Sequence, residues 1–360
     1  MEIRGIEPAQ IGINETLLAL SNGRIGVRGS FEQGAPAHQP GTLMNGFHEI
    51  WPIEYPEAGH GYATCGQTIV YIPDATKLEV SGLSLAEAEV VRKLDLRSGI
   101  LTTTARWREQ EVTWERLVSL THSGVVAFRF SGEPRPLRVL SGWRNRQDTD
   151  YLDTGDGGFD PRRAKSFGRR VLVPVDTKFE PPRAAAGFRT RRSEMEISIA
   201  MEHDATAWAV NASDADYVEY TMEAPSLEKK VVYLPIDQPD LALVELGATP
   251  DFSRLAAEQA GALQAFWDDA EIAIGGDSQL QQAVNWILFQ LYQASALVEG
   301  TGIPAKGLTG QAYEGHYFWD TDVFVLPFLA HAHPPAAKEL IKFRHSLLPA
   351  ARERARVMAE

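Results

Sequence analysis

Short apolar runs alternate with polar positions through residues 1–245, and many of the runs have a period of two. They are rich in Val, Ile, Thr and aromatic residues, and Gly, Pro, Asn and Asp separate them, as is typical of strands and turns. The clearest runs cover 67–72, 99–107, 111–120, 124–130, 194–200, 205–210, 216–222 and 229–235. Asn22-Gly23 adds a tight-turn signal. Strands at this spacing, with few helical patterns between them, predict an antiparallel β-sandwich.

From about residue 250 the apolar positions recur every three to four residues, which indicates helices. A first helix follows the capping residue Asp251 and is interpreted as a linker. A second helix over 278–299 starts at Asp277 or Ser278 and ends before Gly300. Its apolar side is formed by Leu280, Val284, Ile287, Leu288, Leu291 and Tyr292.

Two further helices are expected in the last part of the chain. Asp320 or Thr321 can cap a helix that Pro327 kinks or breaks. Another helix over 336–359 is interrupted near Pro349 and continues to the last residue without a stop signal. The predicted fold is thus mixed, all-β then all-α, with a β-sandwich domain at 1–248, a linker helix at 249–275 and a helical domain at 276–360 that we expect to be truncated.

Two segments have little regular pattern. Residues 144–192 are rich in Arg, Gly, Asp and Pro and are interpreted as a long loop or an irregular insertion. Residues 46–66 combine aromatic residues, His and Glu, and are interpreted as a loop with its own small side-chain cluster. The alternative is a loop that reaches the mouth of the helical domain and shapes a site there, within one chain or across a dimer.

Composition limits the functions that the chain can have. It has 360 residues, 44% hydrophobic and 23% charged, which are ordinary values for a globular protein. The net charge of −13 argues against nucleic acid and against anionic membrane surfaces as partners. Cys65 is the only cysteine, so no intrachain disulfide can form. No secretory signal and no apolar run of about 18 residues is visible, so a cytoplasmic protein is expected.

The stretch "GLTGQAYEGHYFWDTDVF", residues 307–324, has an unusual mixture of glycines, aromatic residues and acids. Its Trp319-Asp320 pair has two interpretations. Asp320 can be a helix N-cap next to a core or interface Trp, with His316 a polar loop residue. Alternatively, the flat Trp ring and the carboxylate bind a carbohydrate, whose C–H faces and adjacent hydroxyls match those two groups.

Residues 306–329, "KGLTGQAYEGHYFWDTDVFVLPFL", resemble a signature of the family 65 glycoside hydrolases, which are mostly inverting disaccharide phosphorylases such as maltose, trehalose and kojibiose phosphorylases. Segments 14–34, 40–53, 66–78 and 343–355 are similar to other parts of these proteins. The resemblance implies a β-sandwich, linker helices and an (α/α)6 barrel, of which this chain would hold the first helices.

The resemblance also implies a function, with substrate-binding residues Trp319 and Asp320 and, with weaker claims, their neighbours His316, Tyr317 and Phe318. The chain would be the N-terminal portion of an α-glucoside phosphorylase, which converts a disaccharide and phosphate to β-glucose 1-phosphate and a sugar. No catalytic residue is expected within it, because the general-acid Glu and the phosphate-binding residues would lie beyond Glu360. The chain alone is therefore expected to be inactive.

No metal site and no organic cofactor is implied, phosphate is the co-substrate, and a homodimer is compatible with the family for the full-length enzyme. His331 and His333 lie two positions apart, which places them on different faces of a helix, so they form a poor metal-binding pair. Two other functions stay open. One is a hydrolase of the same family that acts on an α-glucoside such as trehalose. The other is a non-catalytic carbohydrate-binding protein, if this is the natural length.

Overall fold

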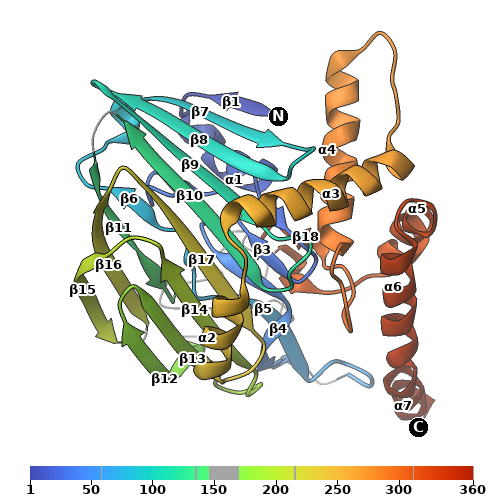
Figure 1. Cartoon of the computed structure of the whole chain (residues 1–360). Helices are drawn as coiled ribbons and strands as arrows, with labels where there is room; N and C mark the ends of the chain where they lie inside the picture. The colour runs from blue at the N-terminus through green and yellow to red at the C-terminus, as the bar shows by residue number, and fades with distance from the viewer. Residues whose placement is uncertain (58, 134–135, 146–169, 215, 311, 360) are drawn as a thin grey trace.

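A computed structural model describes residues 1–57, 59–133, 136–145, 170–214, 216–310 and 312–359. Within these residues the β-rich part lies on one side of the molecule, and the helices α4 (Ser278–Ser295), α5 (Leu326–Ala332), α6 (Pro334–Ser346) and α7 (Leu348–Ala359) lie on the other (Figure 1). Every strand pair in the sheets is antiparallel. The order is therefore a β-rich domain followed by helices, as predicted, whereas an (α/α)6 arrangement and the domain boundaries stay predictions.

The largest sheet has nine strands. In spatial order they are β1 (Glu2–Arg4), β7 (Glu89–Asp95), β8 (Ile100–Trp107), β9 (Gln110–Val118), β10 (Val125–Glu133), β17 (Ser226–Leu234), β14 (Glu196–His203), β13 (Arg183–Thr190) and β12 (Leu172–Glu180). Two of these strands, β12 and β13, lie inside the segment that was interpreted as irregular. That interpretation is wrong for the hairpin, and residues 146–169 of the segment lie outside the described residues.

Two four-stranded sheets cover one face of the large sheet. One contains β15 (Ala207–Asp214), β16 (Tyr217–Ala224), β11 (Leu137–Arg144) and β6 (Leu78–Val80), and the other β2 (Leu20–Ser21), β3 (Ile25–Val27), β4 (Thr42–Pro52) and β5 (Cys65–Ile72). The indole of Trp114 on β9 donates a hydrogen bond to the Leu78 carbonyl of β6 at 2.9 Å. Lys229 on β17 donates to the Gly142 carbonyl of β11 at 2.9 Å. These bonds cross the core between the layers.

β4 corrects a second prediction, because residues 46–52 form a strand and not a loop. The connection from β4 to β5 extends toward the last helix, where the His60 ring lies 3.4 Å from the Met358 carbonyl. The rings of Tyr55 and Tyr62 in this connection lie 4.8 Å apart. The segment therefore holds the predicted small cluster, and its tip contacts α7.

Among the described residues, the helices apart from the short turns at 312–315 and 321–325 are η1 (Pro8–Gln10), α1 (Ile11–Leu17), η2 (Leu85–Glu87), α2 (Pro239–Ala248), α3 (Phe252–Ala270), α4 (Ser278–Ser295), α5 (Leu326–Ala332), α6 (Pro334–Ser346) and α7 (Leu348–Ala359). The side chain of Asp251 caps α3 and that of Asp277 caps α4, as predicted. α1 and α2 were not predicted. α4 ends at Ser295, five residues before the expected Gly300, and the break between α6 and α7 falls at Leu347.

Helices α2 and α3 cover the outer face of the nine-stranded sheet. Ala242 and Leu246 of α2 and Phe252 and Leu255 of α3 are fully buried in one cluster with Leu117, Val125, Ala127, Ala185, Ala200 and Val232 of the sheet. α4 is tied to β2, because the Gln293 side chain accepts a hydrogen bond from the Ser21 backbone N–H at 2.9 Å. α3 and α4 thus place the later helices against the β domain.

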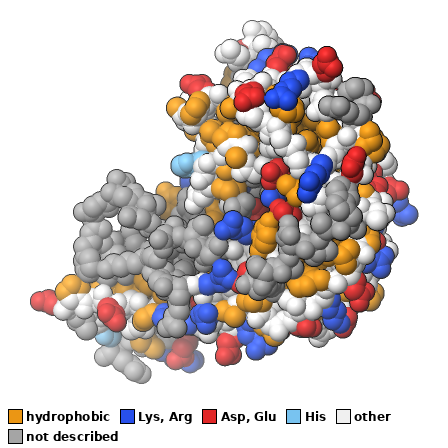
Figure 2. All heavy atoms as spheres, turned by 90° about the vertical axis from the view of Figure 1, so that its left-hand side faces the viewer, with side chains coloured by type: hydrophobic (Ala, Val, Ile, Leu, Met, Phe, Trp, Pro, Cys, Tyr) orange, Lys and Arg blue, Asp and Glu red, His pale blue; other side chains and the backbone are white. Residues whose placement is uncertain are grey.

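The face of the β domain that points away from the helices has a mixed surface. Acidic, basic and apolar side chains are interspersed over the part of it that is described (Figure 2). The expectation that nucleic acid is no partner rests on the net charge and stays a prediction. Among the described residues, no helix combines the length and apolar character needed to cross a membrane.

Candidate functional site

The signature segment forms three short elements between the β domain and the helices: β18 (Ala305–Leu308), the turn η4 (Ala312–Gly315) and the π-helical turn η5 (Thr321–Val325). β18 packs on the four-stranded sheet of β2–β5, since Leu308 is buried in a cluster with Leu43, Ile69 and Tyr71. A Cβ atom on Gly26 of β3 would lie 2.2 Å from that of Leu308. Only glycine allows this close approach of the two strands.

η4 has an unusual backbone. Tyr313 and Glu314 have φ values of 57° and 56°, and Gly315 follows with 74°. The left-handed conformation costs a non-glycine residue about 1–3 kcal/mol and persists only where the surroundings enforce it, often at functional sites. Here the Ala305 N–H donates to the His316 carbonyl at 3.0 Å. A Cβ on Gly315 would lie 2.7 Å from that of Ile69, so the turn is pressed onto β5.

His316 and Tyr317 face the β domain. The Nε2 atom of His316 lies 2.8 Å from the Gln67 carbonyl of β5. The Tyr317 hydroxyl donates to Oδ1 of Asn45 at 2.8 Å, and burial raises the pKa of this phenol. The Asn45 amide in turn donates to the Gly23 and Gly302 carbonyls at 2.8 and 2.9 Å. These two predicted sugar-binding side chains therefore fasten the segment to the sheet.

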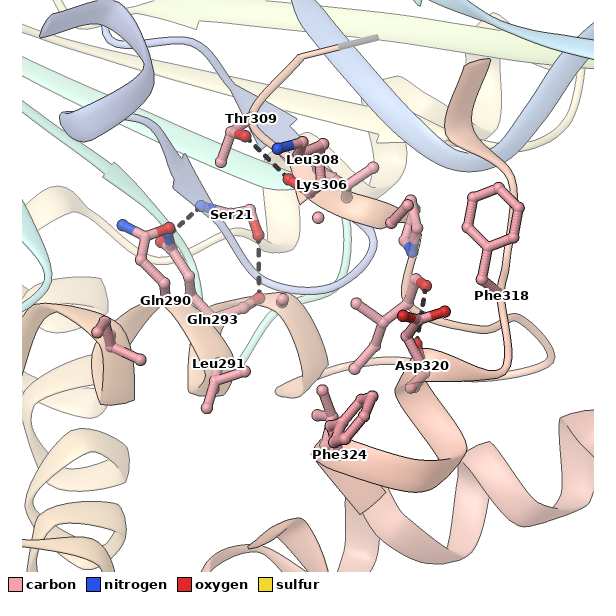
Figure 3. Close-up of a pocket in the computed structure, with 18 of the residues that line it drawn as sticks. Ser21, Gln290, Leu291, Gln293, Lys306, Leu308, Thr309, Phe318, Asp320 and Phe324 are labelled. Atoms are coloured by element: carbon pink, nitrogen blue, oxygen red, sulfur yellow. Dashed lines mark hydrogen bonds between the residues drawn. The ribbon is translucent and has the colours of Figure 1, made fainter. Parts of the chain in front are cut away.

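Phe318 and Asp320 turn the other way and line a cavity of about 650 Å³ between α4, β18 and η5 (Figure 3). Its apolar wall includes Trp286, Ile287, Leu291, Ile303, Leu308, Phe324 and Val325, and its polar groups come from Ser21, Gln290, Lys306, Thr309, Asp320 and Thr321. An apolar hollow with a few polar groups is the usual form of a small-molecule site.

The N-cap interpretation of Asp320 is wrong. Its own backbone is helical, with φ −55° and ψ −38°, and its side chain makes no capping hydrogen bond. An N-cap residue needs an extended backbone to turn its oxygen back onto the helix, which explains the difference. α5 begins at Leu326 with Pro327 in its first turn, where the missing N–H costs nothing. Asp320 instead belongs to the lining of the cavity.

Trp319 does not line this cavity. Its side chain is 68% exposed, and the guanidinium carbon of Arg344 lies 4.5 Å from the centre of its ring. The Trp319-Asp320 pair is therefore divided, with the carboxylate in the cavity and the indole on the neighbouring surface. Of the five predicted side chains, the structure brings Phe318 and Asp320 together in one hollow and places His316, Tyr317 and Trp319 outside it.

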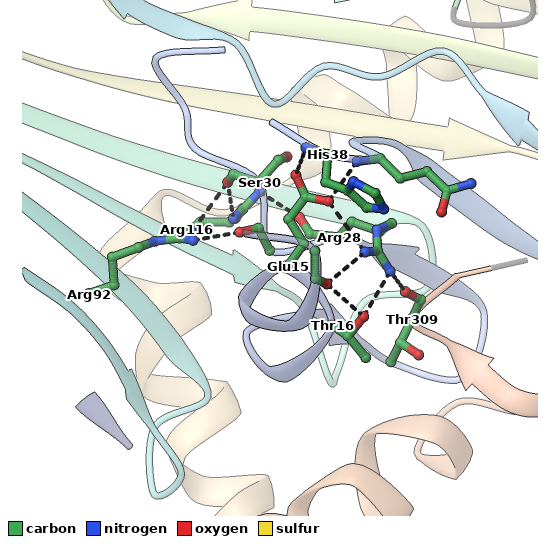
Figure 4. A network of polar contacts seen from close by, with 11 residues as sticks. Glu15, Thr16, Arg28, Ser30, His38, Arg92, Arg116 and Thr309 are labelled. Carbon is green, nitrogen blue, oxygen red and sulfur yellow. Dashed lines mark hydrogen bonds and ion pairs between the residues drawn. The ribbon is translucent and has the colours of Figure 1, made fainter. Parts of the chain in front are cut away.

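A buried polar network, which sequence reasoning missed, holds the loop after β18 (Figure 4). Arg28 donates to the Thr309 carbonyl, to the Thr16 hydroxyl at 3.2 Å and to Glu15 at 3.3 Å. Glu15 also accepts the backbone N–H groups of His38 and Gln39 at 2.9 and 2.8 Å. The sequence did contain a signal for it, because segment 14–34, which resembles part of the family 65 glycoside hydrolases, includes both Glu15 and Arg28. The network fixes one wall of the cavity, because Thr309 belongs to its lining.

The remaining sequence candidates do not form a site. Cys65 is exposed and has no disulfide partner. Within the described part of the chain, no group of three or more His, Cys, Asp or Glu side chains is arranged to hold a metal ion. The His333 ring packs against Tyr292 with a centroid distance of 5.3 Å, and burial lowers its pKa.

Comparison with known proteins agrees with this arrangement of a β domain followed by helices. One solved structure, provisionally described as a kojibiose phosphorylase from the human microbiome, superposes over 99% of this chain and 50% of its own with a TM-score of 0.83. Its sequence is 22% identical to this chain, so the likeness shows the fold.

The family is shown by two sequence models. The N-terminal domain of glycosyl hydrolase family 65 matches residues 2–265, and the central catalytic domain of the same family matches residues 285–360. The chain belongs to glycosyl hydrolase family 65.

Among its relatives are an uncharacterised glycosyl hydrolase of Mycobacterium tuberculosis, 36% identical, and the alpha,alpha-trehalose phosphorylase of Thermoanaerobacter brockii, 31% identical. Each alignment covers 95% of this chain and 47% or 49% of the relative. The chain thus spans about half the length of the curated relatives it matches.

Proposed function

We propose that this chain is the N-terminal portion of an α-glucoside phosphorylase, which transfers a glucosyl group from a disaccharide to phosphate with inversion. The carrying observation is the Asp320 carboxylate, which the family's signature segment holds at the cavity wall without using it as a helix cap. Membership of the family and the phosphorylase relative support the reaction.

The cavity has the chemistry of a sugar subsite. A carboxylate can accept hydrogen bonds from two adjacent hydroxyls, and such charge-assisted bonds are stronger than neutral ones. The aromatic rings of Phe318, Phe324 and Trp286 line the same hollow and suit the apolar C–H faces of a pyranose. We propose that Asp320 binds sugar hydroxyls and that Phe318 packs against the apolar face of the sugar. Trp319 would offer a further aromatic contact on the surface beside the cavity.

In the proposed reaction, a phosphate oxygen attacks the anomeric carbon from the face opposite the glycosidic oxygen. The bond to that oxygen breaks as a carboxylic acid protonates it, so the products are β-glucose 1-phosphate and the released sugar. Phosphate is already anionic, and no general base is required to activate it. We place the general acid and the phosphate site in the part of the enzyme that these 360 residues do not cover.

The proposed role of Asp320 predicts how much activity its replacement by Asn removes. Asn keeps the shape of the side chain but removes its charge and replaces one acceptor with a donor. Hydrogen bonds to a charged group contribute about 1.5–3 kcal/mol. Asp320→Asn is therefore expected to lower kcat/KM by roughly 10- to 150-fold.

The reaction is tested with the protein expressed from the complete reading frame that contains this segment. It is incubated with maltose, trehalose or kojibiose, with and without phosphate, and the products are followed by NMR. We expect β-glucose 1-phosphate and no turnover without phosphate. Free glucose formed independently of phosphate would identify a hydrolase instead, and saturable sugar binding without turnover would identify a non-catalytic carbohydrate-binding protein.

The other expectations for the whole enzyme are also proposals. Phosphate acts as co-substrate, no metal or organic cofactor takes part, and the enzyme functions in the cytoplasm. A homodimer is testable by light scattering of the same preparation. A mass equal to one chain at micromolar concentration would exclude it.

A further inference from the structure

Arg344, on α6, reaches across to the residues on both sides of Asp320. Its Nη2 and Nε atoms pair with the two carboxylate oxygens of Asp322 at 2.5 and 3.3 Å. Nη2 also lies 3.5 Å from the Phe318 carbonyl, and the guanidinium carbon lies 4.5 Å from the centre of the Trp319 ring. One side chain thus contacts residues 318, 319 and 322.

Among the described residues, no side chain pairs with the Asp320 carboxylate as Arg344 does with that of Asp322. The Asp320 carboxylate caps no helix, and the residue directly precedes η5, between Trp319 and Thr321. The place of the carboxylate in the cavity is therefore set by the backbone on either side of it. Arg344 contacts this segment on both sides of Asp320, at the Phe318 backbone carbonyl and at the Asp322 carboxylate.

The contacts require an arginine. The planar guanidinium can face a carboxylate with two nitrogens and stack on an indole at the same time. A lysine ammonium can do one or the other. The Arg344 and Asp322 side chains are 27% and 20% exposed, so solvent weakens the ion pair and its contribution to stability is modest. The arrangement defines geometry more than it stabilises the fold.

We propose that Arg344 is a positioning residue that holds Asp320 in its sugar-binding place. This rests on the proposed function, because Asp320 is the group that it positions. Small errors in the place of a binding group reduce rates strongly, and an error of about 1 Å can cost 100-fold. Arg344→Gln is expected to lower kcat/KM by roughly 10-fold and to weaken disaccharide binding.

A double-mutant cycle in the full-length enzyme separates positioning from general stabilisation. It compares the wild-type protein, Arg344→Gln, Asp320→Asn and the double variant, with kcat, KM, the disaccharide Kd and thermal melting measured on each. If Arg344 acts through Asp320, Arg344→Gln has little further effect once Asp320 is Asn, about 3-fold or less. Equal losses in both backgrounds would overturn the proposal.

Two more variants complete the test. Lys342→Gln is the matched control, because Lys342 lies on the same helix and pairs with Glu339 at 2.6 Å. It is expected to leave kinetics and melting unchanged. Arg344→Lys keeps the charge and is expected to recover part of the activity. It also replaces Arg344→Gln in the cycle if that variant does not fold, and wild-type kinetics in Arg344→Lys would then contradict the proposal.

The outcomes also separate this proposal from the function beneath it. If Asp320→Asn leaves the disaccharide Kd and the kinetics unchanged, the sugar-binding role of Asp320 fails, and positioning by Arg344 fails with it. If Asp320→Asn has its expected effect and Arg344→Gln has none, only the positioning role of Arg344 is wrong.

Discussion

The two halves of the signature segment differ in what their side chains contact. In residues 314–317, His316 and Tyr317 are hydrogen-bonded to the β domain and the backbone is pressed onto β5. In residues 318–325, Trp319 and Phe324 are 68% and 73% exposed. Neighbouring aromatic residues in one motif therefore have different roles. Residues 314–317 fasten the loop to the β domain, and residues 318–325 leave large aromatic side chains exposed.

The largest expected effect comes from breaking the network that holds the loop. Arg28→Ala leaves the Glu15 carboxylate buried without its cation, because the two side chains are 5% and 2% exposed. Removing one partner of a buried ion pair costs about 3–5 kcal/mol. Denaturant unfolding of the full-length protein measures this loss.

The matched variant for that experiment is the double change Glu15→Leu with Arg28→Met, which removes both charges together. It is expected to cost less than Arg28→Ala, since no uncompensated charge remains. A double variant that is less stable than Arg28→Ala would show that the ion pair itself, and not the avoidance of a buried charge, stabilises this region.

Tyr317→Phe is expected to have an intermediate effect. It leaves the buried Oδ1 atom of Asn45 without the hydroxyl that donates to it at 2.8 Å. An unsatisfied buried acceptor costs about 1–3 kcal/mol. Thermal melting should fall while kcat/KM measured well below the melting temperature stays close to wild type. Tyr62→Phe, at a half-exposed tyrosine, is the control and should not change the melt. A large kinetic loss without destabilisation would show that the Tyr317 hydroxyl acts in ligand binding and not in folding.

Trp319→Ala is expected to give the smallest effect. In contrast to Tyr317→Phe, it should weaken disaccharide binding and leave the melting temperature nearly unchanged. The exposed ring contributes little to folding, and its contact with Arg344 is worth about 0.5–1 kcal/mol. Aromatic packing against a sugar is worth about 0.5–1.5 kcal/mol, which corresponds to a roughly 2- to 10-fold weaker disaccharide Kd. Calorimetric titration measures it. Unchanged affinity would restrict the sugar site to the cavity that Phe318 and Asp320 line.

Local signals predicted much of the fold. The alternating runs became strands, and Asp251 and Asp277 cap the helices that they were expected to start. The hairpin of β12 and β13 was missed because β13 reads Arg-Ala-Ala-Ala-Gly-Phe-Arg-Thr, with residues of low strand propensity. These small residues are buried where the sheet packs closely, for example Ala185 against Ala200 and α2. The strand conformation of this segment therefore depends on tertiary packing, which the local sequence pattern does not contain.

The site was predictable only in part. The motif directed attention to Trp319 and Asp320, but the division of its aromatic residues between sheet and surface depends on the path of the backbone through η4. Arg28 and Thr309 are 281 positions apart, and Arg344 and Asp322 are 22 apart. Nothing in one sequence indicates which charged residue meets which loop, so the residues that hold the site became visible only in three dimensions.

The central claim is that the Asp320 carboxylate binds a sugar and does not stabilise the fold. It is tested most directly by Asp320→Asn in the full-length protein, with thermal melting and kinetics measured on the same preparation. We predict an unchanged melt and a loss of roughly 10- to 150-fold in kcat/KM, because the side chain makes no capping bond and, in the proposed site, its charge binds sugar hydroxyls. Unchanged kinetics, with or without a shifted melt, would contradict the claim.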